Sequence, residues 1–160
     1  MVNNLSLRGN QISLISLEDE SCISSFNLIN ESKFIDKNIE VLISENKTQR
    51  NIGYIYCYNY RSFDGYLYIK ININNNGNEN KEMLIEACVL LFDYIFTMMP
   101  VRKIYYEVFE YEINYFKFIK NMGFKLEANL KEDKFFNGKY NDKYILSLYR
   151  ENFYMRLKNE

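Results

Sequence analysis

The chain has 160 residues, of which 48% are hydrophobic and 26% are charged, enough apolar material for one globular domain with a real core. Its formal net charge of −1 provides no basic field, so the composition argues against nucleic-acid binding. No apolar run is long enough to span a bilayer, and no charged-then-apolar leader opens the chain. We therefore expect a soluble cytoplasmic protein with neither a membrane nor a nucleic acid as partner.

The complete absence of histidine excludes several kinds of enzyme. Ser-His-Asp and Cys-His catalysis, the HExxH zinc motif and most other zinc sites all require that residue. No DxDxDG calcium loop is present either, so we expect no metal. Cys22, Cys57 and Cys88 are far apart and form no CxxC pair, and each is predicted to be a small buried hydrophobic residue.

The first third of the chain predicts a strand, a helix and a strand pair. Ile12–Ile15 is a candidate first strand, and an amphipathic helix is expected from Leu17 to about Phe34, with Ser16 as a plausible N-cap. Residues 39–44 and 51–58 read as consecutive strands.

Four tyrosines share one face of the predicted strand that begins at Asn51. They are Tyr54, Tyr56, Tyr58 and Tyr60, with Ile55 and Cys57 on the opposite face. A stripe of tyrosines offers flat apolar area with polar tips and can line a substrate groove. It is more often the half-buried face of a strand, which is the default interpretation here.

The central segment reads as strand, polar loop and helix. An alternating strand over residues 65–73 is followed by an Asn-rich loop over 74–80 and a helix from about Lys81 to Met99, which Pro100 ends. A strand at 103–109 follows, so the unit predicts parallel pairing of the two strands. The expected apolar face of the helix consists of Leu84, Ala87, Cys88, Leu91, Tyr94, Ile95 and Met98.

The last third carries a second helix that ends at Met122-Gly-Phe124, and then a hairpin. Asn137-Gly138 lies between two β-like runs and predicts a type I′ turn, because that turn needs a positive φ at both central residues. The second β-like run is expected around Tyr144–Asn152.

This order of elements resembles the cofactor-binding half of the GNAT N-acetyltransferases. Lys120-Asn-Met-Gly-Phe-Lys-Leu-Glu127 is similar to the EKxGFxxEG segment of the ribosomal-protein-acetyltransferase-like branch. Asn137-Gly138, Asp142 and Tyr144–Asn152 are similar to its NGxxxDxxxYxLxRxEW segment. The resemblance implies one α+β domain over residues 1–160. Its central, mostly antiparallel sheet would hold one parallel splayed strand pair, with helices on both faces.

In that family, acetyl-CoA enters the gap between the two parallel strands as the donor substrate. Backbone groups of the strand before the loop hold the pantetheine, which the resemblance assigns to Ile71, Asn72 and Ile73. The pyrophosphate binds at the N-terminus of the following helix, where N–H groups and the helix dipole favour anions. The candidate residues there are Asn78, Asn80 and Lys81.

The phosphate-binding loop departs from the family pattern, Arg/Gln-x-x-Gly-x-Gly/Ala. Glu79 replaces the Arg or Gln, Glu82 the first Gly and Leu84 the small residue. Two carboxylates repel a pyrophosphate, and side chains at the glycine positions crowd it. The motif is therefore degenerate.

Only carboxylates remain as standard general bases when histidine is absent. Glu107 is the best candidate because it lies in the strand flanking the gap and its neighbours alternate around it, although a solvated strand residue explains it equally well. The usual Tyr that protonates the thiolate is replaced by Ile119, and Tyr115, one turn earlier, is the candidate substitute. Glu112 stands where Asn contacts the pantetheine arm, with Asn114 nearby as a candidate contact.

Three functions follow from this resemblance. The first is an acetyl-CoA-dependent N-acetyltransferase acting on a small amine, an amino sugar or a protein N-terminus. The second is a binding or scaffold module that has lost acetyl transfer, and the third is an acyltransferase whose donor is an acyl carrier protein. The C-terminal strands could also pair across a homodimer.

Overall fold

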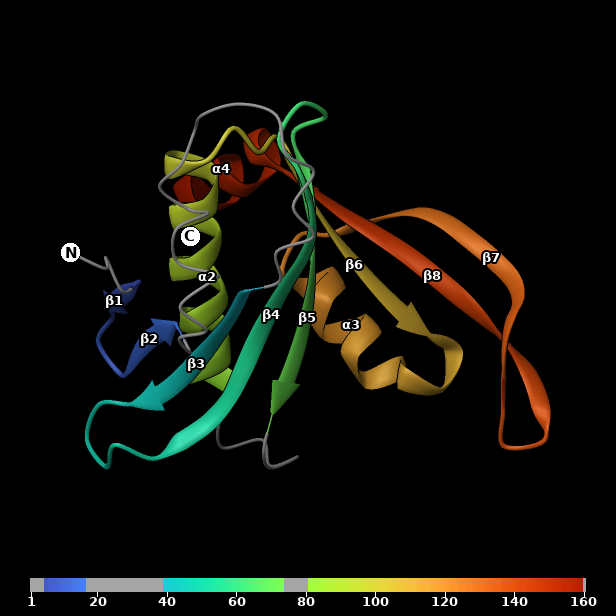
Figure 1. The fold of residues 1–160 in the computed structure, drawn as a ribbon, viewed down its shortest axis with the longest axis horizontal. Coiled ribbons are helices and arrows are strands. Elements are labelled where there is room, and N and C mark those ends of the chain that lie inside the picture. Colours follow the sequence, from blue (N-terminus) through green and yellow to red (C-terminus); the bar gives the residue numbers. More distant parts are fainter. Residues whose placement is uncertain (1–4, 17–38, 74–80, 160) are drawn as a thin grey trace. The chain divides into compact units, whose positions relative to one another are not determined.

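A computed structural model of the chain describes residues 5–16, 39–73 and 81–159 (Figure 1). The chain divides into two compact units. The first comprises residues 1–60 and 70–99, and the second comprises residues 61–69 and 100–160. The predicted helix over residues 17–34 and the Asn-rich loop over 74–80 lie outside the described residues.

The first unit contains an antiparallel run of strands and one helix. Strands β1 and β2 pair with each other, β2 pairs with β3, and β3 pairs with β4, all antiparallel. The elements are β1 (Ser6–Arg8), β2 (Ile12–Ser16), β3 (Ile39–Glu45), most of β4 (Asn51–Arg61), the end of β5 (Tyr66–Ile73) and α2 (Lys81–Met98). The predicted strands and the predicted helix start are confirmed.

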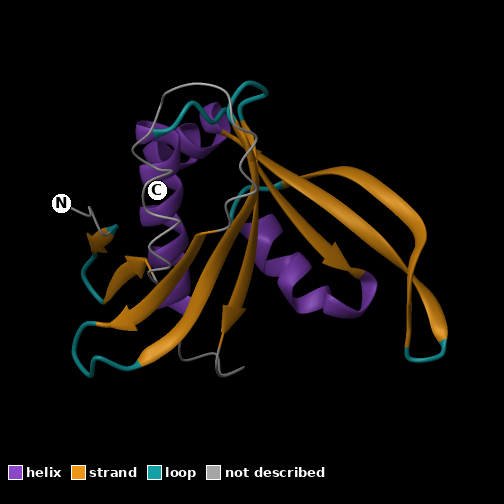
Figure 2. Cartoon of the chain, in the orientation of Figure 1, coloured by secondary structure: helices purple, strands orange, loops and turns teal. Residues whose placement is uncertain are grey.

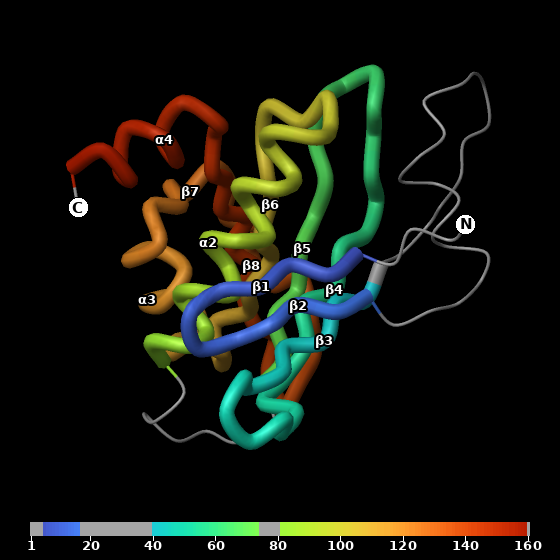
Figure 3. Tube along the Cα trace, turned by 90° about the vertical axis from the view of Figure 1, so that its left-hand side faces the viewer, coloured from blue at the N-terminus to red at the C-terminus, as the bar shows by residue number. Residues whose placement is uncertain are grey.

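Two polar side chains fix the turns of this unit. The amide of Asn46 donates to the carbonyl oxygen of Gly9 (3.0 Å) and accepts from the hydroxyl of Ser13 (2.6 Å). The carboxylate of Glu86, on α2, accepts from the backbone N–H of Gln11 (3.1 Å), and also from that of Asn10. Figure 3 shows the β1–β2 hairpin running beside α2, where these bonds hold it.

Helix α2 buries a wide apolar face. The predicted Leu84, Ala87, Cys88, Leu91 and Ile95 are all buried, together with Phe92 and Phe96. Met98 was predicted to lie on this face but is 62% exposed, so that assignment is wrong. Cys88, Phe92 and Phe96 follow one another at intervals of four residues and are all buried, so the buried face of the helix does not include Met98.

The two described cysteines are buried hydrophobic residues, as predicted. Cys57 and Cys88 are both free thiols. Burial raises the pKa of Cys57 to about 12. Burial also raises the pKa of Cys88, and the nearby Cys57 adds to that shift. Neither thiol is a nucleophile at neutral pH, and Cys22 lies outside the described residues.

The second unit is built on one parallel strand pair and a long hairpin. Tyr66–Ile69 of β5 pairs in parallel with Lys103–Tyr106 of β6, as predicted. Strand β8 pairs antiparallel with β6 on one side and with β7 on the other. The remaining elements are β6 (Lys103–Phe109), the 3₁₀ turn η2 (Glu110–Glu112), α3 (Ile113–Asn121), β7 (Lys125–Phe136), β8 (Lys139–Tyr149) and α4 (Arg150–Asn159).

The described strands follow the order β1-β2-β3-β4-β5-β6-β8-β7 in a mostly antiparallel sheet with one parallel pair (Figure 2). This is the mixed α/β architecture that the sequence predicted. Helix α2 contacts β2 within the first unit, whereas α3 contacts β6 and α4 contacts β8 within the second. The expected placement of helices on both sheet faces stays a prediction, because the helices belong to different units.

Glycine and asparagine make the two tight turns of the second unit. Gly123, with φ 94°, ends α3. Asn137 and Gly138 have φ 51° and 78°, which confirms the predicted positive φ at both turn positions. Helix α4 was not predicted. It begins at Arg150, whose backbone N–H donates to the carbonyl of Arg102 (3.0 Å) and whose guanidinium donates to that of Val101 (2.6 Å).

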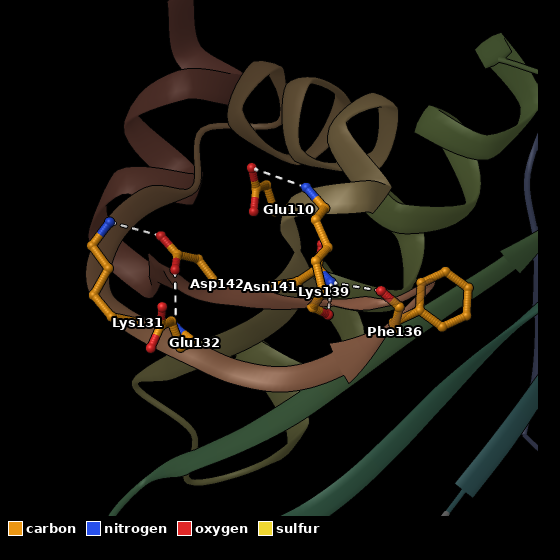
Figure 4. A network of polar contacts seen from close by, with 7 residues as sticks. All are labelled: Glu110, Lys131, Glu132, Phe136, Lys139, Asn141 and Asp142. Carbon is orange, nitrogen blue, oxygen red and sulfur yellow. Dashed lines mark hydrogen bonds and ion pairs between the residues drawn. The ribbon is translucent and has the colours of Figure 1, made fainter.

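A bulge in the β7–β8 hairpin is closed by Asp142 (Figure 4). Its carboxylate accepts from the ammonium of Lys131 (2.7 Å) and from the backbone N–H of Glu132 (3.0 Å), which has φ 51°. The bond from Lys131 and then that from Glu132 lower the pKa of Asp142. Nearby, the amide of buried Asn141 donates to the carbonyl of Phe136 (3.2 Å). The hairpin tip is thus fixed by polar bonds.

None of the described helices is both long and apolar enough to cross a membrane.

Candidate active site

The first unit carries a small hollow on one face of strands β3, β4 and β5. Its volume is about 210 Å³. Every residue that lines it is half-buried, so each side chain packs partly against its neighbours on the sheet and is partly exposed to solvent. The lining residues are Glu40, Tyr54, Tyr56, Lys70 and Asn72.

Strand alternation brings these side chains together. Glu40 of β3 is the cross-strand partner of Tyr56 on β4. Gly53 of β4 lies against the backbone of β5, where an added Cβ would stand 2.3 Å from the carbonyl oxygen of Asn72. Because successive side chains point to opposite faces, Tyr54 and Tyr56 of β4 share one face, as do Lys70 and Asn72 of β5, and these four line the hollow with Glu40. The intervening Ile55, Cys57 and Ile71 are buried.

The hollow combines one carboxylate, one ammonium, one amide and two phenol rings. It is smaller than the pockets of about 300–1,000 Å³ that hold drug-sized ligands, so it suits a small polar molecule. All four tyrosines of the stripe are half-buried on β4, which confirms the default interpretation, and Tyr54 and Tyr56 also line the hollow. Tyr58 stacks on Tyr56, with ring centroids 5.7 Å apart, and does not line the hollow.

Sequence reasoning missed Glu40 and Lys70. Both are single charges on the polar face of an alternating strand, and such residues usually face solvent. One feature of the sequence could have identified them: strand alternation places each on the same sheet face as the tyrosine stripe of the neighbouring strand.

The predicted donor-site residues of the first unit lie on two elements. Ile71 is buried, and Asn72 and Ile73 are half-buried at the end of β5. These three follow Ile69, the last β5 residue in the parallel register with β6. Lys81 is exposed at the first position of α2. Asn78, Asn80 and Glu79 lie outside the described residues.

Glu82 is exposed in the first turn of α2. A carboxylate there interacts favourably with the positive end of the helix dipole. Glu82, which replaces the first glycine of the family loop, thus has a structural role in the helix.

The predicted catalytic residues belong to the second unit. Glu107 is half-buried on β6, and its carboxylate oxygen lies 3.9 Å from the ammonium of Lys143. Asp133 lies closer to the same ammonium, at 3.1 Å. Tyr115 is half-buried on α3, where burial, and then the charge of Glu112, raise its pKa. Asn114, beside it in sequence, is exposed.

Two departures from the family pattern have structural explanations here. The Glu112 carboxylate accepts a hydrogen bond from the backbone N–H of Phe109 (3.0 Å), which closes the turn between β6 and α3. Ile119 is fully buried, so α3 uses this position for packing. Neither position supplies the side chain that the family uses there.

A cluster that sequence reasoning did not find lies on the same face of β6 as Glu107. The ammonium of buried Lys103 lies 2.9 Å from a carboxylate oxygen of Glu127, and the hydroxyl of Tyr105 donates to that oxygen (3.0 Å). Tyr105 also stacks on Tyr68, with centroids 4.9 Å apart.

Burial opposes both charges in this cluster, but hydrogen bonds outweigh it. Those from Ser147, Lys103 and Tyr105 lower the pKa of Glu127. Those with Tyr105 and Glu127 raise the pKa of Lys103. The two groups are therefore a mutually satisfied ion pair.

Within the described ranges, no three Asp, Glu or Cys side chains gather as a metal site would require.

Comparison with known proteins decides the family. The model of the acetyltransferase (GNAT) domain matches residues 20–145, which is most of the sequence. The chain belongs to this family. It is accordingly an N-acyltransferase, which agrees with the resemblance seen in its second half. No curated protein matches the sequence.

Solved acetyltransferases share the fold at low sequence identity. Spermidine/spermine N-acetyltransferase SpeG from Vibrio cholerae is 20% identical, with TM-score 0.70, covering 91% of this chain and 96% of that one. Spermidine N-acetyltransferase from the same organism, in complex with CoA and spermine, is 19% identical, with TM-score 0.69, covering 90% and 98%. The N-terminal domain of a ribosomal-protein-alanine acetyltransferase from Clostridium acetobutylicum is 15% identical, with TM-score 0.62, covering 94% and 99%.

Proposed function

We propose that the protein transfers the acetyl group of acetyl-CoA to a primary amine held in the hollow of the first unit. The observation that carries this proposal is the set of Glu40, Tyr54 and Tyr56 around that hollow. A carboxylate and phenol faces attract an ammonium before it is deprotonated. The hollow also adjoins Asn72, which belongs to the strand segment proposed for the donor.

The reaction is a direct acyl transfer. The nitrogen lone pair of the neutral amine attacks the thioester carbonyl carbon, and a C–N bond forms as the C–S bond breaks. CoA leaves as the thiolate, which takes a proton, and the amine loses one proton. Nothing is oxidised or reduced. Backbone N–H groups of the donor strand stabilise the oxyanion.

The donor residues are proposed from the family resemblance. Backbone groups of Ile71, Asn72 and Ile73 hold the pantetheine, since the parallel register covers only the first four residues of β5. Asn78, Asn80 and Lys81 hold the pyrophosphate, and Asn114 contacts the pantetheine arm.

Glu107 is proposed as the general base and Tyr115 as the general acid. The Glu107 carboxylate is half-buried on β6, 3.9 Å from the ammonium of Lys143. The phenol of Tyr115 carries a proton at neutral pH, and its raised pKa makes it a weaker acid than an ordinary tyrosine.

Several broader assignments belong to the same proposal. Residues 1–160 form one acyltransferase domain, because the family match runs through both units. The proposal also includes the splayed parallel strands, a cytoplasmic location, homodimer formation through the C-terminal strands, and membership of the ribosomal-protein-acetyltransferase-like branch. A neighbour from that branch supports the last of these.

Glu82 favours a second candidate function. Its carboxylate in the first turn of α2 repels a pyrophosphate, as would Glu79 in the sequence. An acyl carrier protein as donor would avoid that penalty, since its contacts need not reproduce the CoA phosphate site. A binding module that has lost acetyl transfer is the other function that this degenerate phosphate-binding loop would allow.

Melting curves with acetyl-CoA and with pantetheine test the donor. A ligand at a hundred times its Kd that binds only the folded state adds about 2.7 kcal/mol, or roughly 5–10 °C in a domain of this size. We expect a smaller shift than this with acetyl-CoA at ordinary concentrations, and a larger one after Glu79→Arg with Glu82→Gly.

The same curves separate the candidates. No shift for either protein with either ligand supports the binding module. A shift with pantetheine but none with acetyl-CoA supports the carrier-protein donor. Release of free CoA thiol in the presence of an amine panel then tests transfer itself.

A further inference from the structure

The second unit has a hollow that contains none of the residues proposed for acetyl transfer. Its volume is about 390 Å³. The β4–β5 turn, the segment before β6 and the first residue of α4 surround it (Figure 1). Its lining includes Phe63, Asp64, Gly65, Val101, Arg102 and Arg150, and we call it the Arg102 hollow.

Hydrogen bonds hold the three surrounding segments together. The carbonyl oxygen of Gly65 accepts from the backbone N–H of Arg102 (2.7 Å) and from that of Lys103 (3.1 Å). At the start of α4, the backbone N–H of Arg150 donates to the carbonyl oxygen of Arg102 (3.0 Å). The guanidinium of Arg150 donates to the carbonyl oxygen of Val101 (2.6 Å). The walls of the Arg102 hollow are therefore fixed by the fold itself.

The side chain of Arg102 has a defined orientation in this hollow. Its Nε donates to the carbonyl oxygen of Asp64 (3.0 Å). Gly65 leaves room for its stem, because a Cβ added there would stand 3.1 Å from Cγ of Arg102. Within the described residues, the Arg102 side chain makes no other hydrogen bond and no ion pair. Its two terminal amino groups are thus available for the paired hydrogen bonds that a carboxylate or a phosphate accepts.

We infer that the Arg102 hollow binds a small organic anion, in which a carboxylate or a phosphate is attached to a flat apolar body. The guanidinium of Arg102 receives the anionic group. The ring of Phe63 is 95% exposed, so contact with a flat apolar body removes apolar area from water. A volume of about 390 Å³ is within the range of small-molecule pockets. This site goes beyond the proposed function and does not depend on acetyl transfer.

Asp64 limits the affinity of the site for anions. Its side chain is exposed at the same hollow, and its carboxylate repels a second negative charge. A cationic ligand that paired with Asp64 would instead meet the guanidinium of Arg102, which repels it. The hydrogen bond that orients Arg102 uses the backbone carbonyl of Asp64, so Asp64→Asn removes the repulsion and keeps that bond.

The experiment titrates benzoate, phenyl phosphate, benzamide and inorganic phosphate into the isotope-labelled protein at constant ionic strength. Benzamide has the shape of benzoate without its charge, and inorganic phosphate has the charge without a ring. The backbone amide NMR signals of Gly65 and Arg102 report binding. Arg102→Met removes the guanidinium and keeps most of the stem. Arg8→Met, at an exposed position of β1 in the first unit, is the matched control.

We expect benzoate and phenyl phosphate to shift these signals saturably, and the tighter of the two identifies the preferred anionic group. Arg102→Met should weaken binding by about 10–100-fold, as the loss of charged hydrogen bonds implies, whereas Arg8→Met should bind as wild type. Arg102→Lys keeps the charge without the paired geometry and should bind more weakly than wild type. Phe63→Ser should weaken benzoate but not inorganic phosphate, and Asp64→Asn should tighten both.

Three results would each overturn the inference. They are no saturable shift with either aromatic anion, equal affinity for benzamide and benzoate, and unchanged affinity in Arg102→Met. Melting curves establish that each variant is folded. They also give a second readout, because a ligand that binds only the folded state raises the melting temperature of wild type more than that of Arg102→Met.

Discussion

Two clusters of tyrosines with one lysine and one glutamate lie on sheet faces, one in each unit. In the second unit Lys103 and Glu127 meet at 2.9 Å, and Tyr105 bonds to the same oxygen. In the first unit Glu40 and Lys70 both line an open space. The same residue types thus form an ion pair in the second unit and line the candidate binding site in the first.

The β7 bulge accounts for the contact in the second unit. A register shift between Leu126 and Ala128 leaves Glu127 out of the ladder and re-aims it towards Lys103. On β8, Tyr149 stands opposite Lys103, and the small, buried Ser147 stands opposite Tyr105. In the first unit Tyr56 is the cross-strand partner of Glu40. A tyrosine therefore faces a charged residue in both clusters, and ring size does not separate them.

The largest expected effect distinguishes Glu107 on β6 from Glu127 on β7. Glu107→Gln should lower kcat on the order of 10²–10⁴-fold, because it removes the proposed base while keeping size and hydrogen bonding. Steady-state kinetics measure this. Glu127→Gln is the matched carboxylate control on the same face and should leave kcat nearly unchanged. An unaltered rate in Glu107→Gln would eliminate Glu107 as the base.

The comparison can be sharpened by removing one ring of the first cluster. Tyr56→Ser should remove an aromatic wall of the hollow. We expect kcat/KM for the acceptor to fall on the order of tenfold, a loss of about 1.4 kcal/mol in binding. Tyr58→Ser, outside the hollow on the same strand, is the control. Equal losses in the two variants would mean that the hollow is not the acceptor site.

A smaller effect, on stability, is expected in the satisfied cluster. Glu127→Gln should destabilise the fold by about 1 kcal/mol, below the cost of a fully buried pair because this carboxylate is partly exposed to solvent. Glu40→Gln should change stability by less than about 0.5 kcal/mol, as is usual for half-exposed positions. Urea unfolding compares the two. A greater loss in Glu40→Gln would reverse the contrast between the clusters.

The smallest expected effect is the pH dependence of that stability difference. The folded-state pKa of Glu127 is lowered, so its contribution is present above its unfolded pKa of about 4.3 and is lost as pH falls through the folded value. The gap in unfolding free energy between wild type and Glu127→Gln should therefore be constant near neutral pH and shrink in acid. A gap that persists below pH of about 3 would show that packing, rather than charge, carries the effect.

The sequence by itself determined the elements whose signals are local. Residues 103–109 form a strand as predicted, Asn137-Gly138 turns the hairpin, and Gly123 ends α3. These features depend on alternation or on the φ preference of one or two residues, which neighbours along the chain already specify. The family motifs of the second half had the same local character.

The tertiary structure decided which charges meet and which stay apart. Glu40 and Lys70 are thirty residues apart and were not chosen from the sequence, and the Lys103–Glu127 pair depends on a strand that follows both residues in the chain. Helix α4 also escaped prediction, because contacts of Arg150 with the segment before β6 fix its start. Sequence periodicity tells which face a side chain takes. Strand order and register determine what it touches there.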